Sequence, residues 1–283
     1  MIAVLGAGGQ LGSAFVRRLG DRCLAVTRDE LDLAETGSID PWVDLLRPDL
    51  VINCAAYTAV DAAETDADTA WAVNAVAVGA LAEATARRDV GFVTYSTDYV
   101  FDGEKESGYV ESDQPNPLNV YGATKLEGER LALDAHPKAL IVRTSWLLSA
   151  THRNFLTTML DLLDKGEVRV VNDQKGRPTF VDDLITGTLA AVDAGASGLL
   201  HLTNQGETTW FGLAHEIAST TGRDPSLVKP TNSSALNRPA ARPANSVLDS
   251  ERRQQVGIDA LPPYLEALTR TCGEMDPLTG PDR

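Results

Sequence analysis

The chain has little cysteine and little histidine, and neither residue type forms a metal-binding pattern. Its 283 residues include three cysteines, Cys23, Cys54 and Cys272, and four scattered histidines. No CxxC pair or other metal spacing occurs, and an odd number of cysteines gives no disulfide framework. Cys23 and Cys54 lie in apolar runs, which is typical of small core residues in a reducing compartment. We therefore expect a cytoplasmic protein without a metal site.

Long apolar runs and basic stretches are also absent. No run of about eighteen apolar residues, the length that suggests a transmembrane helix, occurs in the sequence. The N-terminus begins directly with the apolar run of residues 2–5, without the basic segment of a secretory signal. The formal net charge is −15, and no basic stripe is found that could hold a phosphate backbone. We expect neither a membrane nor a nucleic acid as partner.

Glycine is present where a nucleotide-binding turn needs it. The apolar run at residues 2–5 leads into a Gly-x-x-Gly-x-x-Gly turn at residues 6–12 and then into a helical apolar pattern. This order lets the backbone approach a diphosphate closely, and the helix N-terminus stabilises the negative charge. The alternative is a tight link between strand and helix. The residues expected to contact a dinucleotide here are Gly6, Gly9, Gln10, Leu11 and Gly12.

The end of the second predicted strand, residues 23–27, bears on the choice of cofactor. At this point an acidic residue suits the ribose of NADH, whereas an arginine suits the 2′-phosphate of NADPH. Arg28 stands there, followed by two acidic residues, so the charges are mixed. The sequence favours NADPH, with NADH and a merely exposed arginine as alternatives. Asp32 and Leu33 are expected to lie near the adenine.

Strands and helices alternate through roughly the first 150 residues. Further strands are predicted at residues 49–56, 90–96 and 139–145, and a helix from about 68 to 88. Asn74 interrupts the apolar face of that helix, and we expect its amide to bond to backbone groups or to support the active site. The alternation predicts an α/β fold with a Rossmann-like, doubly wound parallel sheet, whose ligands bind at the carboxyl ends of the strands. The residues expected there are Ala55, Ala56, Tyr57, Tyr95, Thr97, Asp98 and Trp146.

Beyond Trp146 the pattern changes to shorter elements. We predict a dinucleotide-binding domain over residues 1–150 and mainly a smaller C-terminal α/β substrate-binding domain over residues 151–283. A helix and a strand within residues 181–204 are expected to return to the first domain. A last helix is predicted near residues 261–270.

Tyr121 and Lys125 lie four residues apart where a helical pattern begins, so they share one helix face. A phenol beside an ammonium group suits proton donation to a carbonyl oxygen, because the positive charge lowers the phenol pKa. The same spacing also occurs by chance, as an aromatic rim residue beside a solvated lysine. Other motifs in the chain must therefore decide whether Tyr121 and Lys125 are catalytic.

Three motifs in the right order resemble the extended short-chain dehydrogenase/reductase family. These are the glycine turn at residues 6–12, Ser96-Thr97-Asp98, and Tyr121-x-x-x-Lys125. More narrowly, the chain resembles the dTDP-4-dehydrorhamnose reductases from Met1 to about Leu268. The segments that carry this resemblance are residues 53–64, 96–103, 172–179 and 242–246.

The resemblance implies NADPH-dependent reduction of the C4 keto group of dTDP-4-dehydro-6-deoxy-L-mannose (dTDP-4-dehydrorhamnose) to dTDP-L-rhamnose. Tyr121 would protonate the developing alkoxide, Lys125 would bind the nicotinamide ribose, and Thr97 would orient the reacting oxygen. Trp146 would lie against the deoxysugar, with a core tryptophan as alternative. The expected catalytic residues are Tyr121, Lys125 and Thr97; Tyr121 and Lys125 also bind cofactor; and Thr97, Asp98, Tyr121 and Trp146 bind substrate.

Other interpretations stay open at this point. The chain could reduce another dTDP-4-keto sugar, for example one that decorates an antibiotic, or it could be a non-catalytic regulatory subunit on the same fold. We expect a monomer or homodimer. The metal-dependent dimerisation of some relatives is not transferred, because residues 12–15 lack a glutamate. Arg177 and Arg242 are candidates to hold the diphosphate of the nucleotide sugar, with surface ion pairs as the alternative.

Overall fold

Six parallel strands form the central sheet of the computed structural model, which describes residues 1–275. The strand order is β10-β5-β4-β3-β1-β2. It reverses between β1 and β3, so the carboxyl ends of these two strands form the crevice where doubly wound sheets bind their ligands. The strands of this sheet are β1 (Ile2–Leu5), β2 (Cys23–Val26), β3 (Leu50–Asn53), β4 (Gly91–Thr97), β5 (Leu140–Thr144) and β10 (Gly198–His201).

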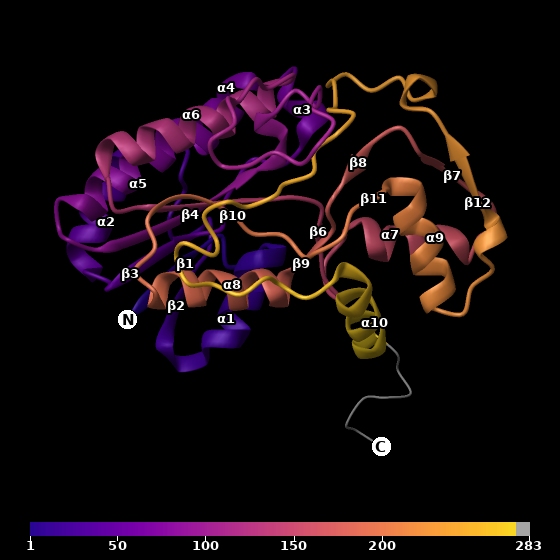
Figure 1. Ribbon diagram of the computed structural model, residues 1–283. Coiled ribbons are helices and arrows are strands. Elements are labelled where there is room, and N and C mark those ends of the chain that lie inside the picture. The colour runs from indigo at the N-terminus through magenta and orange to yellow at the C-terminus, as the bar shows by residue number, and fades with distance from the viewer. Residues whose placement is uncertain (276–283) are drawn as a thin grey trace.

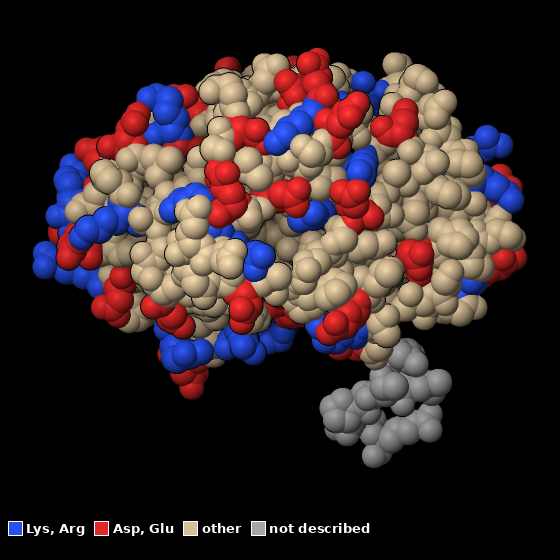
Figure 2. Space-filling view, viewed as in Figure 1, with Lys and Arg blue, Asp and Glu red and all other residues tan. Residues whose placement is uncertain are grey.

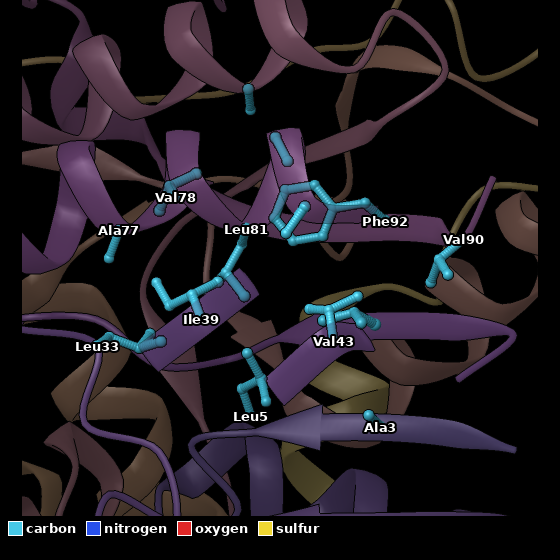
Figure 3. Close-up of a cluster of buried hydrophobic side chains, with 14 of the residues drawn as sticks. Ala3, Leu5, Leu33, Ile39, Val43, Ala77, Val78, Leu81, Val90 and Phe92 are labelled. Carbon is cyan, nitrogen blue, oxygen red and sulfur yellow. The ribbon is translucent and has the colours of Figure 1, made fainter. Parts of the chain in front are cut away.

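Helices cover both faces of this sheet (Figure 1). Along β1, Ala3 and Leu5 belong to the apolar cluster of one face and Val4 to that of the other, because side chains alternate along a strand. Figure 3 shows the first cluster, in which Ile39 and Val43 pack near Leu5. The helices on that face are α2 (Ile39–Leu46), α5 (Ala77–Ala86) and α6 (Val120–Ala135), and those on the other are α1 (Gln10–Leu19) and α8 (Val181–Asp193).

The helix predicted from about residue 68 to 88 is interrupted in its geometry. It consists of α4 (Ala67–Trp71), a π-helical segment (Ala72–Val76) and α5 in direct succession. A short helix, α3 (Val60–Ala63), precedes it. π-Helical turns are rare and occur frequently at functional sites. Asn74 lies within this one.

A smaller lobe follows β5 and has its own apolar cluster (Figure 1). The last helix begins at Tyr264, later than predicted, because Leu261 and Pro262 each precede a proline and are therefore disfavoured in helical geometry. The helices here are α7 (Phe155–Leu163), α9 (Trp210–Thr220) and α10 (Tyr264–Met275). The short paired strands are β6 (Leu147–Leu148) with β9 (Thr179–Phe180), β7 (Val168–Val171) with β12 (Val228–Thr231), and β8 (Lys175–Gly176) with β11 (Thr208–Thr209).

The predicted α/β class with a doubly wound parallel sheet is confirmed. β10 pairs with β5 at the edge of the main sheet, and α8 packs against α1. The division into a domain of residues 1–150 and a second domain of residues 151–283 stays a prediction. Residues 276–283 of the second domain lie outside the described part of the chain. Within residues 1–275, no helix is both long and apolar enough to cross a membrane. On the face shown in Figure 2, basic side chains are interspersed with acidic ones.

Candidate active site

Two neighbouring cavities lie at the carboxyl ends of β1, β3 and β4. Their volumes are about 320 Å³ and about 540 Å³, and Ala55 and Ala56 line both. Of the predicted residues, the smaller cavity is lined by Gly6, Arg28, Asp32, Leu33, Ala55, Ala56 and Tyr57. The larger is lined by Gly9, Gln10, Leu11, Ala55, Ala56, Tyr95, Thr97, Asp98, Tyr121, Lys125 and Trp146.

Gly12, unlike the other predicted residues of the glycine turn, lines neither cavity. A Cβ at Gly12 would come 2.2 Å from the carbonyl oxygen of Gly6, so this glycine lets α1 pack directly against the turn. Gly6 has φ of +71°, and a Cβ there would come 2.7 Å from the backbone nitrogen of Ala55. Glycine is therefore required at both positions, by the packing at residue 12 and by packing and backbone conformation at residue 6.

The larger cavity offers polar atoms that have no partner within residues 1–275. They are Nε2 of Gln10, Oγ of Ser96, Oδ2 of Asp98 and Oγ of Thr144. Buried polar atoms are usually hydrogen-bonded, and exceptions mark places where a ligand completes the bonding. Together with the glycine turn and the second, adjoining cavity, this pattern fits a dinucleotide that spans both cavities.

Thr97, at the end of β4, brings Tyr121 and Asp98 into one hydrogen-bonded group. Its hydroxyl accepts from the backbone nitrogen of Tyr99 at 3.2 Å and donates to Oδ1 of Asp98 at 3.0 Å. The same hydroxyl hydrogen-bonds to the phenol of Tyr121. Burial raises the pKa of Asp98 to about 6, while interactions with Ser246 and Thr97 hold it lower than burial alone would. A carbonyl oxygen placed beside Thr97 and Tyr121 would thus meet two hydroxyl groups.

The expected lowering of the Tyr121 pKa by Lys125 is wrong for the ligand-free chain. Burial raises the pKa of Tyr121 well above its ordinary value, and the hydrogen bond with Thr97 offsets only part of this. Burial also lowers the pKa of Lys125 to about 8, against a smaller opposite effect of Glu129. Desolvation disfavours the charged form of both groups, and spacing on a helix does not reveal desolvation. Tyr121 is therefore a neutral phenol that can donate its proton.

A buried ion pair lies behind Lys125 on the same face of α6. Arg143, on β5, donates to both carboxylate oxygens of Glu129 at 2.8 and 2.6 Å, and the two residues are 1% and 4% exposed. Nη1 of Arg143 lies 3.4 Å from Nε2 of His201. Nδ1 of His201 faces the carbonyl oxygen of Asp249 at 2.8 Å and must carry the proton, which leaves Nε2 as acceptor for Arg143. Burial also lowers the pKa of His201.

Asn74 joins the loop between the two cavities to the helix that bears Tyr121. Its Oδ1 accepts from the backbone nitrogen of Tyr57 at 2.8 Å, and its Nδ2 donates to the carbonyl oxygen of Tyr57 at 3.0 Å. Nδ2 also donates to Oγ of Thr124, next to Lys125, at 3.1 Å. The expected bonds to backbone groups are present, and the π-helical turn places this amide between the two segments.

Replacing Asn74 by Ala should lower the free energy of unfolding by about 2–3 kcal/mol, because two backbone groups of the half-buried Tyr57 lose their partner and the buried Thr124 hydroxyl loses one of its two. Urea denaturation measures this loss. The matched control is Asn237→Ala, at an exposed position, for which we expect a change within about 0.5 kcal/mol. Equal stability of the two variants would show that the Asn74 amide does not join these segments.

Trp146 lines the larger cavity and also belongs to the apolar cluster of the smaller lobe. It is 8% exposed, lines the larger cavity and stacks on Trp210 with ring centroids 3.6 Å apart and an interplanar angle of 7°. Its φ of +47° is unusual for a residue with a bulky side chain, and such strain is found mostly at functional sites. A Cβ at Gly176 would come 2.4 Å from the indole. The ring is therefore packed closely against both Gly176 and Trp210.

The two arginines proposed to hold a diphosphate are both engaged in ion pairs. Arg242 donates from Nη1 and Nη2 to the two carboxylate oxygens of Asp61 at 2.9 and 2.8 Å. Arg177 pairs with Asp249 at 2.5 Å and donates to the carbonyl oxygen of Leu248. In the ligand-free chain both arginines therefore form ion pairs, which was the alternative to diphosphate binding.

Sequence reasoning missed several residues that line the larger cavity. Thr144 and Ser145 directly precede Trp146 at the end of β5, so the strand-end argument could have included them. His152 and Arg153 lie in the loop before α7, where no pattern in the sequence pointed to a site. The loop reaches the cavity only through the tertiary fold.

The fold and the joined cavities define a dinucleotide-binding α/β protein. The model of the RmlD substrate binding domain family matches residues 1–276, and the chain belongs to this family. It is 42% identical to the dTDP-4-dehydrorhamnose reductase of Burkholderia thailandensis, over 91% of this chain and 93% of that protein. It is 41% identical to a probable dTDP-4,6-dihydroxy-2-methyloxan-3-one 4-ketoreductase of Streptomyces antibioticus, over 94% of this chain and 92% of the relative.

A solved structure gives the same result for the fold. The dTDP-4-dehydrorhamnose reductase of Bacillus anthracis in complex with NADP superposes with a TM-score of 0.92 at 34% identity. The match covers 96% of this chain and 98% of that one. The resemblance to the reductase family inferred from the sequence motifs is confirmed.

Proposed function

We propose that this chain reduces the C4 keto group of dTDP-4-dehydrorhamnose to give dTDP-L-rhamnose, with NADPH as reductant. The observation that carries the proposal is that Thr97, Tyr121, Lys125 and Trp146 line one cavity, which adjoins a second cavity along the glycine turn. The reductases of Burkholderia thailandensis and Bacillus anthracis support the substrate and the cofactor.

The residues that would hold the cofactor follow from the cavities they line. The adenosine end fits the smaller cavity, with Asp32, Leu33 and Tyr57, and the diphosphate fits the turn at Gly9 and Gln10. Reduced nicotinamide, when bound, supplies a hydride to a carbonyl carbon. We assign Lys125 to the ribose hydroxyls near the nicotinamide, because it is a buried donor in the larger cavity.

The chain's own residues handle the proton and orient the sugar. The Tyr121 phenol donates its proton to the oxygen that gains negative charge, and the Thr97 hydroxyl hydrogen-bonds that oxygen. In the ligand-free chain Thr97 donates its proton to Oδ1 of Asp98 at 3.0 Å, so this proton turns from Asp98 to the substrate oxygen when the substrate binds. Trp146 provides an apolar contact for the deoxysugar where its ring lines the cavity, and stacking on Trp210 holds the ring in place.

A direct assay tests the function. The pure protein is mixed with NADPH and the dTDP-4-keto sugar, the absorbance of the reduced cofactor is followed, and the product is identified. We expect oxidation of NADPH and formation of dTDP-L-rhamnose. Absence of oxidation under these conditions overturns the proposal.

A second candidate is a 4-ketoreductase for another dTDP-deoxysugar. The relative from Streptomyces antibioticus, at 41% identity, supports this candidate as strongly by sequence. A few contacts to hydroxyl groups decide between such substrates. Comparing kcat/KM for the two keto sugars distinguishes the candidates, since the physiological substrate should give the higher value.

Arg28 should contribute to the preference for NADPH over NADH. It lines the smaller cavity at the end of β2, 73% exposed and 3.3 Å from Asp32. Replacing Arg28 by Ala should lower the ratio of kcat/KM for NADPH to that for NADH by about tenfold, because a charge-assisted bond to the 2′-phosphate is lost. The control is Arg22→Ala. Arg22 directly precedes β2, at the end away from the cavity, and its replacement should leave the ratio unchanged. An unchanged ratio in the Arg28 variant removes this residue from the cofactor site.

Three further predictions concern the whole molecule. We propose a dinucleotide-binding domain over residues 1–150 with a mainly substrate-binding remainder. We also propose a cytoplasmic location and a monomeric or homodimeric state. Analytical ultracentrifugation tests the last of these.

A further inference from the structure

The loop between β6 and α7 returns from the smaller lobe to the glycine turn. Nε2 of His152 lies 3.2 Å from the carbonyl oxygen of Gly8, although 144 residues separate them in the sequence. His152 also has a φ of +66°, a conformation that costs free energy in a residue other than glycine. Such a conformation persists only where the surroundings hold it.

Hydrogen bonds at the start of α7 hold this loop in shape. Asn154 and Thr157 form a capping box. Nδ2 of Asn154 donates to the carbonyl oxygen of Ser149 at 2.9 Å, and Oγ of Thr157 donates to that of His152 at 3.2 Å. The residue between His152 and Asn154 is thus presented from a fixed backbone.

Arg153 is that residue, and it lines the larger cavity together with Gly9 and Gln10. It forms neither an ion pair nor a hydrogen bond with any residue of the described chain. Asp98 is the one carboxylate among the described residues that line this cavity. Oδ1 of Asp98 accepts a bond from Thr97, Oδ2 has no partner among the described residues, and Asp98 forms no ion pair with Arg153. Arg153 therefore has its positive charge available for a ligand.

Several other groups that line this cavity are donors. The first turn of α1 has backbone N–H groups without partners inside the helix, no acidic side chain and no side-chain cap at Gly9. Nε2 of Gln10 is buried and has no partner among the described residues. A set of donors with a guanidinium requires a ligand that is rich in acceptors and negatively charged, and a diphosphate meets this requirement.

We propose that Arg153 binds a diphosphate at the larger cavity, and that the contact of His152 with Gly8 holds Arg153 in position. The proposal rests on the proposed function, which supplies two diphosphates, one in NADPH and one in the dTDP-sugar. In a chain with a net charge of −15, an anion needs such local cations. Arg153 would thus couple the loop of the smaller lobe to ligand binding on the main sheet.

Isothermal titration calorimetry on the full chain tests the proposal with four ligands. NADP⁺ and dTDP contain a diphosphate, and adenosine 2′,5′-bisphosphate and dTMP are their counterparts without it. We expect Arg153→Gln to raise the Kd of NADP⁺ or of dTDP by about tenfold, and that of its counterpart by less than about twofold. The affected ligand identifies the source of the diphosphate.

Two variants serve as comparisons. Arg18→Gln, exposed in the last turn of α1, makes the same charge change away from the cavity and should leave all four Kd values unchanged. His152→Gly removes the contact with Gly8 while permitting the positive φ, and should weaken the same diphosphate ligand as Arg153→Gln.

Two results overturn the proposal while the proposed function stands. In the first, Arg153→Gln leaves both diphosphate ligands within about twofold of wild type. In the second, it weakens adenosine bisphosphate and dTMP as much as the diphosphates, which indicates general damage. If wild type binds none of the four ligands, the proposed function fails and this proposal fails with it.

Discussion

Replacing Tyr121 by Phe should lower kcat by about two to four orders of magnitude, the usual range for loss of a positioned proton donor. The phenol hydroxyl is bonded to Thr97 at the end of β4, where both residues line the larger cavity. Because burial keeps the phenol neutral in the ligand-free chain, its proton is available for a developing alkoxide. The aromatic ring remains in the variant, so the Kd of NADPH should change little.

Steady-state kinetics and a separate NADPH titration measure these two effects. The control is Tyr264→Phe, which removes the hydroxyl of a tyrosine that is 9% exposed and lies on α10, in the core of the smaller lobe. We expect its kcat within about twofold of wild type. If Tyr121→Phe retained the full kcat, proton donation would have to come from another group, and the assignment of Tyr121 would be wrong.

Replacing Arg143 by Met should lower the free energy of unfolding by about 3–5 kcal/mol. Arg143 is 1% exposed and holds both carboxylate oxygens of Glu129, which is 4% exposed. Removing one partner leaves a charge buried without compensation, and this costs far more than the pair itself contributes. Denaturation in guanidinium chloride, with activity as a second readout, measures the loss.

The double variant Arg143→Met with Glu129→Gln is the matched comparison. It removes both charges and should be clearly more stable than Arg143→Met alone, because no carboxylate is then left unpaired. If the double variant were as unstable as the single one, the loss would come from packing against Phe101, whose ring lies 5.1 Å from the guanidinium. Charge compensation would then not be the function of this pair.

The main sheet could be predicted because its signals are local. Each buried strand is a short apolar run, and the glycine turn follows the first of them, so the ligand site could be predicted at the carboxyl ends of the strands, where the two cavities lie. The family motifs located Thr97, Tyr121 and Lys125, and the structure brings them into one cavity. These are patterns within a few residues of the chain.

The remaining features depend on contacts between distant segments. The π-helical turn at Ala72–Val76 has the composition of an ordinary helix, and its effect is seen only in the bonds of Asn74 to Tyr57 and Thr124. The pKa of Tyr121 depends on how the fold encloses the phenol. Arg153 lies in an irregular loop that reaches the glycine turn across 144 residues of sequence, counted between His152 and Gly8. No local pattern reports such proximity.

The most direct test of the central claim is to follow the hydride itself. The protein is incubated with the dTDP-4-keto sugar and with NADPH that carries deuterium at the transferred position, and the product is examined by NMR. The cavity assignment predicts deuterium at C4 of dTDP-L-rhamnose. Consumption of NADPH without deuterium at C4, or no consumption at all, would contradict reduction of the C4 keto group by this chain.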